Sequence, residues 1–208
     1  MKSAEIWKNI HTERASLADL LATLTPQQWA QPSWCSSWSI SQVAGHVLAA
    51  AEQTPLNFYR KLAAAGFKFN VFTDNDAKRL GALAPDEIVS RLRLRTSTTN
   101  GPPAPTIAML GEIVVHSSDI RRPLGLDHVA PTAALVAVAD SWKNSNLLIG
   151  SKRRITGVQL LATDTDWSHG TGPQVTGTLN SLILAMTGRK EVHSELSGEG
   201  VTVLADRP

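Results

Sequence analysis

The chain has 208 residues, 42% of them hydrophobic and 18% charged, with a formal net charge of +2. This composition is ordinary for a globular protein, and the small net charge gives no indication of a nucleic-acid or membrane partner. No apolar stretch reaches the ~18 residues of a membrane-spanning helix. The charged residues among residues 1–24 exclude a signal peptide there. The single cysteine, Cys35, cannot form an internal disulfide, so we expect a cytoplasmic protein.

The first predicted helix covers residues 4–24, where apolar side chains recur at helical spacing until Thr25-Pro26 ends the pattern. A connection rich in Trp and Ser follows over residues 27–38. The second predicted helix covers residues 39–65, with a break at a proline. It begins with Ser39 and Gln42 in an S-x-x-Q capping box, in which each side chain meets a backbone N–H group of the other residue.

Residues 67–83 are polar and are expected to be irregular. A third helix is predicted from residue 84, because a proline and two acidic residues occupy its first turn. Three prolines and a glycine in residues 100–105 then require a loop. The fourth predicted helix, residues 106–119, is apolar nearly all round and should lie at the centre of the domain. Four helices with short or medium connections predict a bundle.

The pattern changes near residue 127. We predict a helix over residues 131–148, a strand within 154–163, and turns with a second strand within 164–177. A helix over 178–186 and a short closing strand over 200–205 complete the chain. The predicted fold class is therefore α+β, with a four-helix bundle in residues 1–126 and a small α/β domain in residues 127–208.

The strongest functional signal is the pair Glu112 and His116, the only ionisable groups in the apolar run from residue 107 to 116. Four residues apart on a helix, they project from one face, and burying them is costly without compensation. His46, on a second predicted helix, is the best third partner. Two imidazoles and one carboxylate match a catalytic metal site; zinc fits best, and nickel, cobalt or ferrous iron suit the same ligands. For Glu112 and His116 the alternative is a hydrogen-bonded pair on an exposed face. For His46 the alternative is a core histidine with satisfied hydrogen bonds.

Three further residues are candidates for the same site. Trp38 and Cys35 could line a cofactor pocket, although core or interface packing is the alternative for the indole. A nucleophilic role for Cys35 is less favoured than a buried or wall-lining one, because no histidine adjoins it in the sequence. Asp119 could accept a hydrogen bond from His116, or pair with Arg121 or the arginine that follows it.

Two segments carry a resemblance to a known family. Residues 34–47 (WCSSWSISQVAGHV) and residues 111–123 (GEIVVHSSDIRRP) resemble the metal motifs of the DinB-like, mycothiol-dependent maleylpyruvate isomerase family. Residues 163–172, continued by Gly188-Arg189, look like that family's smaller C-terminal domain.

The resemblance implies a DinB-type bundle in which His46, Glu112 and His116 hold one divalent metal, usually zinc. It also implies mycothiol as a thiol co-substrate, whose sulfur the metal would activate for attack on an electrophilic carbon. Arg189 matches an arginine that the isomerases place near the active site, where it would grip a substrate carboxylate. A cation favoured at a helix C-terminus is the alternative role for Arg189.

The leading hypothesis is therefore a metal-dependent thiol transferase or isomerase acting on a small electrophile, as a monomer or homodimer. A metal- or thiol-binding or stress-sensing protein without turnover, on the same scaffold, is the alternative. Nucleic-acid binding has little support, because the alternating Arg91, Arg93 and Arg95 do not form one stripe on a helix. No membrane partner is expected.

Overall fold

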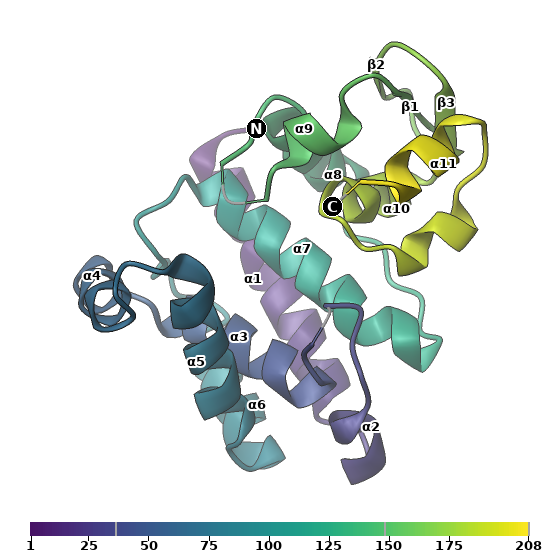
Figure 1. The fold of residues 1–208 in the computed structure, drawn as a ribbon. Coiled ribbons are helices and arrows are strands. Elements are labelled where there is room, and N and C mark those ends of the chain that lie inside the picture. The colour runs from purple at the N-terminus through teal and green to yellow at the C-terminus, as the bar shows by residue number, and fades with distance from the viewer. Residues whose placement is uncertain (36, 148, 208) are drawn as a thin grey trace. The chain divides into compact units, whose positions relative to one another are not determined.

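A computed structural model describes residues 1–35, 37–147 and 149–207 of the chain (Figure 1). The chain divides into two compact units, Met1–His128 and Val129–Pro208. The boundary expected from the sequence lay after residue 126. Within the described residues, no helix is both long and apolar enough to cross a membrane.

The N-terminal unit is helical, and four of its helices correspond to those predicted. α7 packs against α1 and α3, and α1 also packs against α6, so the core lies among these four helices. In chain order the elements are α1 (Ser3–Leu21), α2 (Pro26–Ala30), α3 (Ile40–Glu52), α4 (Pro55–Ala64), α5 (Phe69–Gly81), α6 (Pro85–Leu94), α7 (Thr106–Arg121) and the 3-10 turn η1 (Arg122–Leu124).

The predicted capping box at the start of α3 is present. Ser39 Oγ accepts a hydrogen bond from the Gln42 backbone N–H at 3.4 Å, and Gln42 Oε1 accepts one from the Ser39 N–H at 2.9 Å. The two bonds satisfy backbone donors that a helix leaves without partners in its first turn. α3 therefore begins at a defined residue. The position of His46 around the helix axis, relative to this first residue, is defined as well.

The expectation that residues 67–83 are irregular is wrong, because Phe69–Gly81 forms α5 (Figure 1). α5 packs along α3, with Phe72, Ala77 and Leu80 buried. The two backbones approach so closely that a Cβ on Gly45 would lie 2.3 Å from the backbone nitrogen of Gly81. This segment is rich in weak helix formers, so its helical structure depends on tertiary packing.

The C-terminal unit combines helices with a three-stranded sheet of order β2-β1-β3. β1 pairs antiparallel with β2 and parallel with β3, so that Leu160 lies opposite both His169 and Val175. Every residue of α10 is buried. The elements are α8 (Thr132–Trp142), α9 (Ser151–Ile155), β1 (Gln159–Ala162), β2 (Ser168–Gly170), β3 (Gln174–Gly177), α10 (Leu179–Met186), the 3-10 turn η2 (Glu191–Glu195) and α11 (Gly200–Ala205).

The predicted α+β class is confirmed, and three details of the C-terminal half change. Gly200–Ala205 is a helix and not a strand. The predicted strand within residues 154–163 begins only at Gln159, after α9. The helix predicted to reach residue 148 ends at Trp142, and Leu148 itself lies outside the described residues.

Candidate metal centre

The structure brings together three side chains from two helices. Glu112 and His116 lie one turn apart on α7, and His46 projects toward them from α3. Their potential ligand atoms all lie within 4.8 Å of one another. His46 Nε2 is 2.5 Å from Glu112 Oε1, and the centroids of the two imidazole rings are 4.8 Å apart. The donor set is thus two imidazole nitrogens and one carboxylate oxygen directed at one small volume.

This cluster is largely shielded from solvent. His46 and His116 are each 8% exposed, whereas the Glu112 side chain is 35% exposed and forms the open edge. His46 Nδ1 is buried and has no hydrogen-bond partner among the residues described. A buried polar atom without a partner carries a free-energy penalty. The protein alone therefore leaves the hydrogen bonding of this imidazole incomplete.

Asp119 orients the ring of His116. Its Oδ2 lies 2.9 Å from His116 Nδ1, and the residue is fully buried at 0% exposure. An ionised carboxylate can only accept hydrogen bonds, so in the neutral imidazole Nδ1 carries the proton and Nε2 has the lone pair. A carboxylate behind an imidazole in this way is the usual support of a metal-binding histidine.

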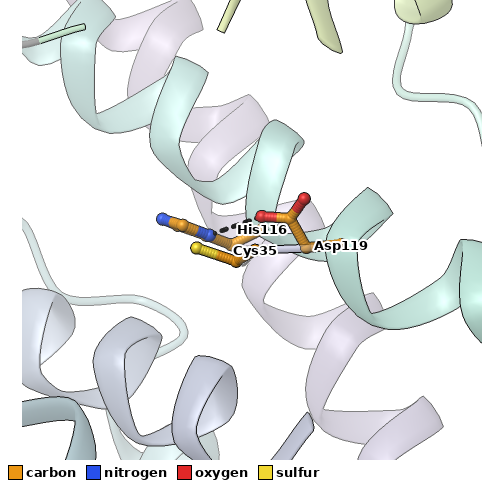
Figure 2. Close-up of side chains that lie close together, drawn as sticks. All are labelled: Cys35, His116 and Asp119. Carbon is orange, nitrogen blue, oxygen red and sulfur yellow. Dashed lines mark hydrogen bonds and ion pairs between the residues drawn. The ribbon is translucent and has the colours of Figure 1, made fainter. Parts of the chain in front are cut away.

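Cys35 lies beside His116 and Asp119, as Figure 2 shows. One potential ligand atom from each of the three residues lies within 4.8 Å of the other two. Backbone bonds fix this loop: the Trp38 N–H donates to the Cys35 carbonyl, and the Trp34 N–H donates to the Asp119 carbonyl, each at 3.0 Å. The half-buried thiol is thereby held at the wall of the cluster.

Trp38 covers the two imidazoles. Its ring centroid is 5.0 Å from that of His46 and 6.4 Å from that of His116. Its Nε1–H donates to Asp74 Oδ1 at 3.0 Å, and Asp74 also pairs with Lys78 at 2.7 Å. The bond from Lys78 and then the bond from Trp38 hold the pKa of the Asp74 carboxyl below its ordinary value. Asp74 was not identified from the sequence because residues 67–83 were expected to be irregular.

A second residue missed from the sequence is Arg14, on the buried face of α1. Its Nη1 donates to the carbonyls of Arg95 and Thr98, at 3.3 and 3.1 Å. Burial lowers the pKa of Arg14 to about 10, and the nearby Glu112 carboxylate partly opposes this, so the guanidinium stays charged at neutral pH. Its helical position could have revealed it, because Ile10 and Leu17 share that face of α1.

A small cavity of about 20 Å³ lies between Arg14 and Glu112, with apolar side chains forming the rest of its wall. It has room for about one water molecule. The lining residues are Arg14, Val47, Ala50, Met109, Glu112 and Ile113.

Arg189 belongs to the C-terminal unit. It follows Gly188, which ends the turn after α10 with a φ of 86°. Its Nη1 lies 3.4 Å from the Thr187 carbonyl oxygen. The substrate contact expected for Arg189 from the resemblance stays a prediction.

Comparison with known proteins supports the resemblance seen in the sequence. Residues 10–101 match the model of the mycothiol maleylpyruvate isomerase N-terminal domain. This range includes Cys35, Trp38 and His46 and ends before Glu112 and His116. No curated protein sequence matches the chain significantly.

Two crystal structures, the mycothiol-dependent maleylpyruvate isomerase and a single-site mutant of it, share the fold. Their TM-scores are 0.65 and 0.64, each at 13% identity and covering 100% of this chain and 95% of the other. At this identity the likeness establishes the architecture alone. Residues 10–101 thus match the model of the mycothiol maleylpyruvate isomerase N-terminal domain, and the chain has the fold of that isomerase.

Proposed function

We propose that this chain is a metal-dependent enzyme that adds a low-molecular-weight thiol, of which mycothiol is the family's example, to a small electrophile. The observation that carries the proposal is the convergence of His46, Glu112 and His116, whose ligand atoms lie within 4.8 Å of one another. Transfer of the thiol and isomerisation through its addition and loss are both outcomes of this chemistry.

The residues present fit a divalent metal. Two imidazoles and one carboxylate suit zinc, nickel, cobalt or ferrous iron, and three protein ligands leave positions for a thiol or water. The His46 nitrogen that lies 2.5 Å from Glu112 Oε1 is Nε2, so this atom and the carboxylate could share one ion. When bound, the metal would lower the pKa of the thiol so that a thiolate exists at neutral pH.

The protein side chains would prepare the site for that chemistry. Asp119 holds the proton on His116 Nδ1 and so keeps Nε2 available as a donor atom. Trp38, fixed by Asp74, covers both imidazoles and limits the access of water to them. Glu112 lies at the more exposed edge, where a thiol and an electrophile can approach. The thiolate would then attack an electrophilic carbon of the substrate.

Metal binding is tested first. Protein purified without added metal or chelator should contain about one divalent ion per chain by elemental analysis. Added zinc or nickel should raise the melting temperature of the metal-free protein, because a ligand that binds only the folded state stabilises it. His46→Ala and His116→Ala should lose both effects. His11→Ala, on α1 and outside the cluster, is the matched control.

If no divalent ion is found and neither metal changes the melting temperature, the proposal is wrong. The thiol step is tested on the metal-loaded protein with mycothiol and a panel of electrophiles containing epoxides, maleylpyruvate and bimane reagents. Thiol-dependent turnover that is lost in His116→Ala supports an enzyme. Metal and thiol binding without turnover on any of these electrophiles would favour the binding or sensing alternative.

A further inference from the structure

The exposed large hydrophobic side chains of this protein are concentrated in one segment. Ten such residues are exposed in the described chain, and five of them lie within residues 56–71, at the hairpin of α4 and α5. Large apolar patches are uncommon on proteins that act alone, and they usually mark a binding surface. We call this group the hairpin patch: Leu56, Tyr59, Phe67, Phe69 and Val71, which are 70, 60, 76, 38 and 42% exposed.

Two members of the hairpin patch, Tyr59 and Phe69, belong to an aromatic cluster that joins α4 to α5. Phe58 is at the centre, with ring centroids 5.4 Å from Phe72, 6.4 Å from Phe69 and 5.5 Å from Tyr59. This cluster fixes α4 against α5, although no residue of α4 is buried. α4 thus lies on the surface of the unit, with its outer side chains directed away from the core.

Phe67 forms the tip of the hairpin. It is 76% exposed and has a φ of 59°, a left-handed conformation that is rare for an aromatic residue. Two backbone bonds close the turn: the Phe67 N–H donates to the Leu62 carbonyl and the Gly66 N–H to the Ala63 carbonyl, both at 2.9 Å. The turn therefore presents a large apolar side chain to solvent in a fixed backbone geometry.

The charge of this segment is positive throughout. Residues 53–73 contain Arg60, Lys61 and Lys68 and no acidic residue. Lys61 is neutralised by Asp76 at 2.7 Å. Arg60 and Lys68 are exposed, and neither forms an ion pair with a described residue. Two free cations thus accompany the hairpin patch.

We propose that the hairpin patch docks on an anionic lipid surface, with its apolar side chains in the headgroup region and Arg60 and Lys68 facing the lipid phosphates. Apolar and aromatic side chains next to unpaired cations are the pattern of segments that lie in a membrane interface. A second copy of the chain is a poorer occupant, because a two-fold contact would place the same cations against each other. A convex helix without buried residues also needs no complementary groove when it enters a lipid interface.

This inference departs from the expectation that no membrane partner exists. That expectation rested on the small total charge and on the absence of a spanning segment. A peripheral contact needs neither, because it depends on the local charge and on a few apolar side chains.

Vesicle sedimentation tests the proposal without any enzymatic readout, so it stands apart from the metal proposal. The full chain should sediment with vesicles of equal parts phosphatidylcholine and phosphatidylglycerol, and only weakly with phosphatidylcholine alone. Added salt should weaken the binding, since the attraction is screened. Arg60→Gln and Lys68→Gln should each lower the partition coefficient about fivefold. Phe67→Ser should lower it about tenfold.

Leu94→Ser is the matched control, because Leu94 is 74% exposed and belongs to α6 and not to the hairpin of α4 and α5. It should leave vesicle binding unchanged, and all variants should keep the melting temperature of the wild type. Equal binding to both vesicle types, or equal losses in Phe67→Ser and Leu94→Ser, would overturn the proposal. So would a patch-dependent dimer in sedimentation velocity, or binding of polyglutamate in place of vesicles, which would indicate an acidic protein partner.

Discussion

Two buried helices, α7 in the N-terminal unit and α10 in the C-terminal unit, differ in what they bury. All eight residues of α10 are buried, and its only polar members are the neutral Asn180 and Ser181. α7 is buried from Leu110 onward except at Glu112, yet it includes His116, Asp119 and Arg121. Charged groups are costly to bury, so a helix that carries several of them needs specific partners for each.

Those partners are visible along α7. Arg121 Nε donates to Ser117 Oγ at 3.0 Å, and its Nη2 donates to Ser16 Oγ at 2.9 Å. Burial lowers the pKa of the Arg121 guanidinium, and the negative charge of Glu13 opposes this. α10 combines apolar packing with hydrogen bonds of neutral groups, such as that from Ser181 Oγ to Glu195 Oε2, whereas α7 itself buries charged side chains. The comparison predicts that substitutions in α10 change stability without changing metal binding, and that substitutions at or beside the charged residues of α7 change metal binding.

The largest effect is expected in α10. Leu182 is fully buried, so Leu182→Ala should lower the free energy of unfolding by about 2–5 kcal/mol through lost burial and the cavity it leaves. Urea denaturation measures this loss. Leu147→Ala, at a side chain that is 71% exposed, is the control and should change stability by less than about 0.5 kcal/mol. A parallel loss of metal affinity in Leu182→Ala would contradict the separation of roles.

A second effect is expected where α3 meets α5. A Cβ added at Gly45 would lie 2.3 Å from the Gly81 nitrogen and 2.8 Å from the Ala77 carbonyl oxygen, both backbone atoms that cannot move alone. Gly45→Ala should therefore cost about 1–3 kcal/mol of stability. It should also weaken metal binding, because Gly45 adjoins His46.

Gly101→Ala is the matched control for this contact. Its added Cβ would meet only the side chain of Met109, which is flexible enough to move. Chemical denaturation compares the two variants. A Gly45→Ala variant as stable as Gly101→Ala would mean that α3 and α5 can separate freely.

The same contact explains why the sequence did not reveal α5. Its residues include Asn70, Thr73 and Asn75, which are weak helix formers, and its apolar positions are few. The helix is stabilised by packing on α3 through Gly45 and Gly81. A contact between two glycines that are far apart in the sequence cannot be predicted from the sequence alone. Asp74 was missed for the same reason.

The closing strand was mispredicted for a different reason. Val201, Thr202 and Val203 favour a strand by composition, but a run of six residues does not decide between strand and helix. In the structure Ser197 already pairs with Thr176, at 2.8 and 2.9 Å, beside β3. The residues that follow therefore form α11 instead of adding to the sheet.

The candidate centre was more accessible to sequence reasoning than either of these elements. Glu112 and His116 are four residues apart in an apolar run, and this local pattern places them on one helix face whatever surrounds them. That His46 lies next to them depends on how α3 packs on α7, which periodicity alone could not give. The capping box at Ser39 predicted only where α3 begins, which places His46 within this helix.

A third prediction concerns the support of His116. Asp119→Asn keeps the size of the side chain and removes its charge, so the His116 ring faces a neutral amide in place of a charged acceptor. Metal affinity, measured by competition with a chelator, should fall about 10–100-fold. Asp140→Asn is the control, because Asp140 pairs with Lys143 and Trp167 within the C-terminal unit. Equal affinities in the two variants would show that Asp119 has no part in the centre.

The smallest effect is a pH dependence at the edge of the same centre. The pKa of the Asp74 carboxyl is lowered in the folded state, chiefly by Lys78 and then by Trp38. A lowered pKa means that the folded state favours the charged form, so the resulting stabilisation is present at neutral pH and is lost as the pH falls through the folded-state value. Wild type and Asp74→Asn should therefore differ in urea midpoint at pH 7, and the difference should shrink below about pH 4.

Trp38→Phe separates the two causes of this shift. It removes the Nε1–H donor and leaves Lys78 in place, so it should reduce the pH-dependent difference without abolishing it. Because Lys78 is the larger cause, Lys78→Gln should reduce the difference more than Trp38→Phe does. The reverse order would mean that the indole, and not the lysine, controls the charge of Asp74. In that case protonation of Asp74 at low pH would chiefly weaken its hydrogen bond with Trp38. The indole would then be held less firmly over His46 as the pH falls.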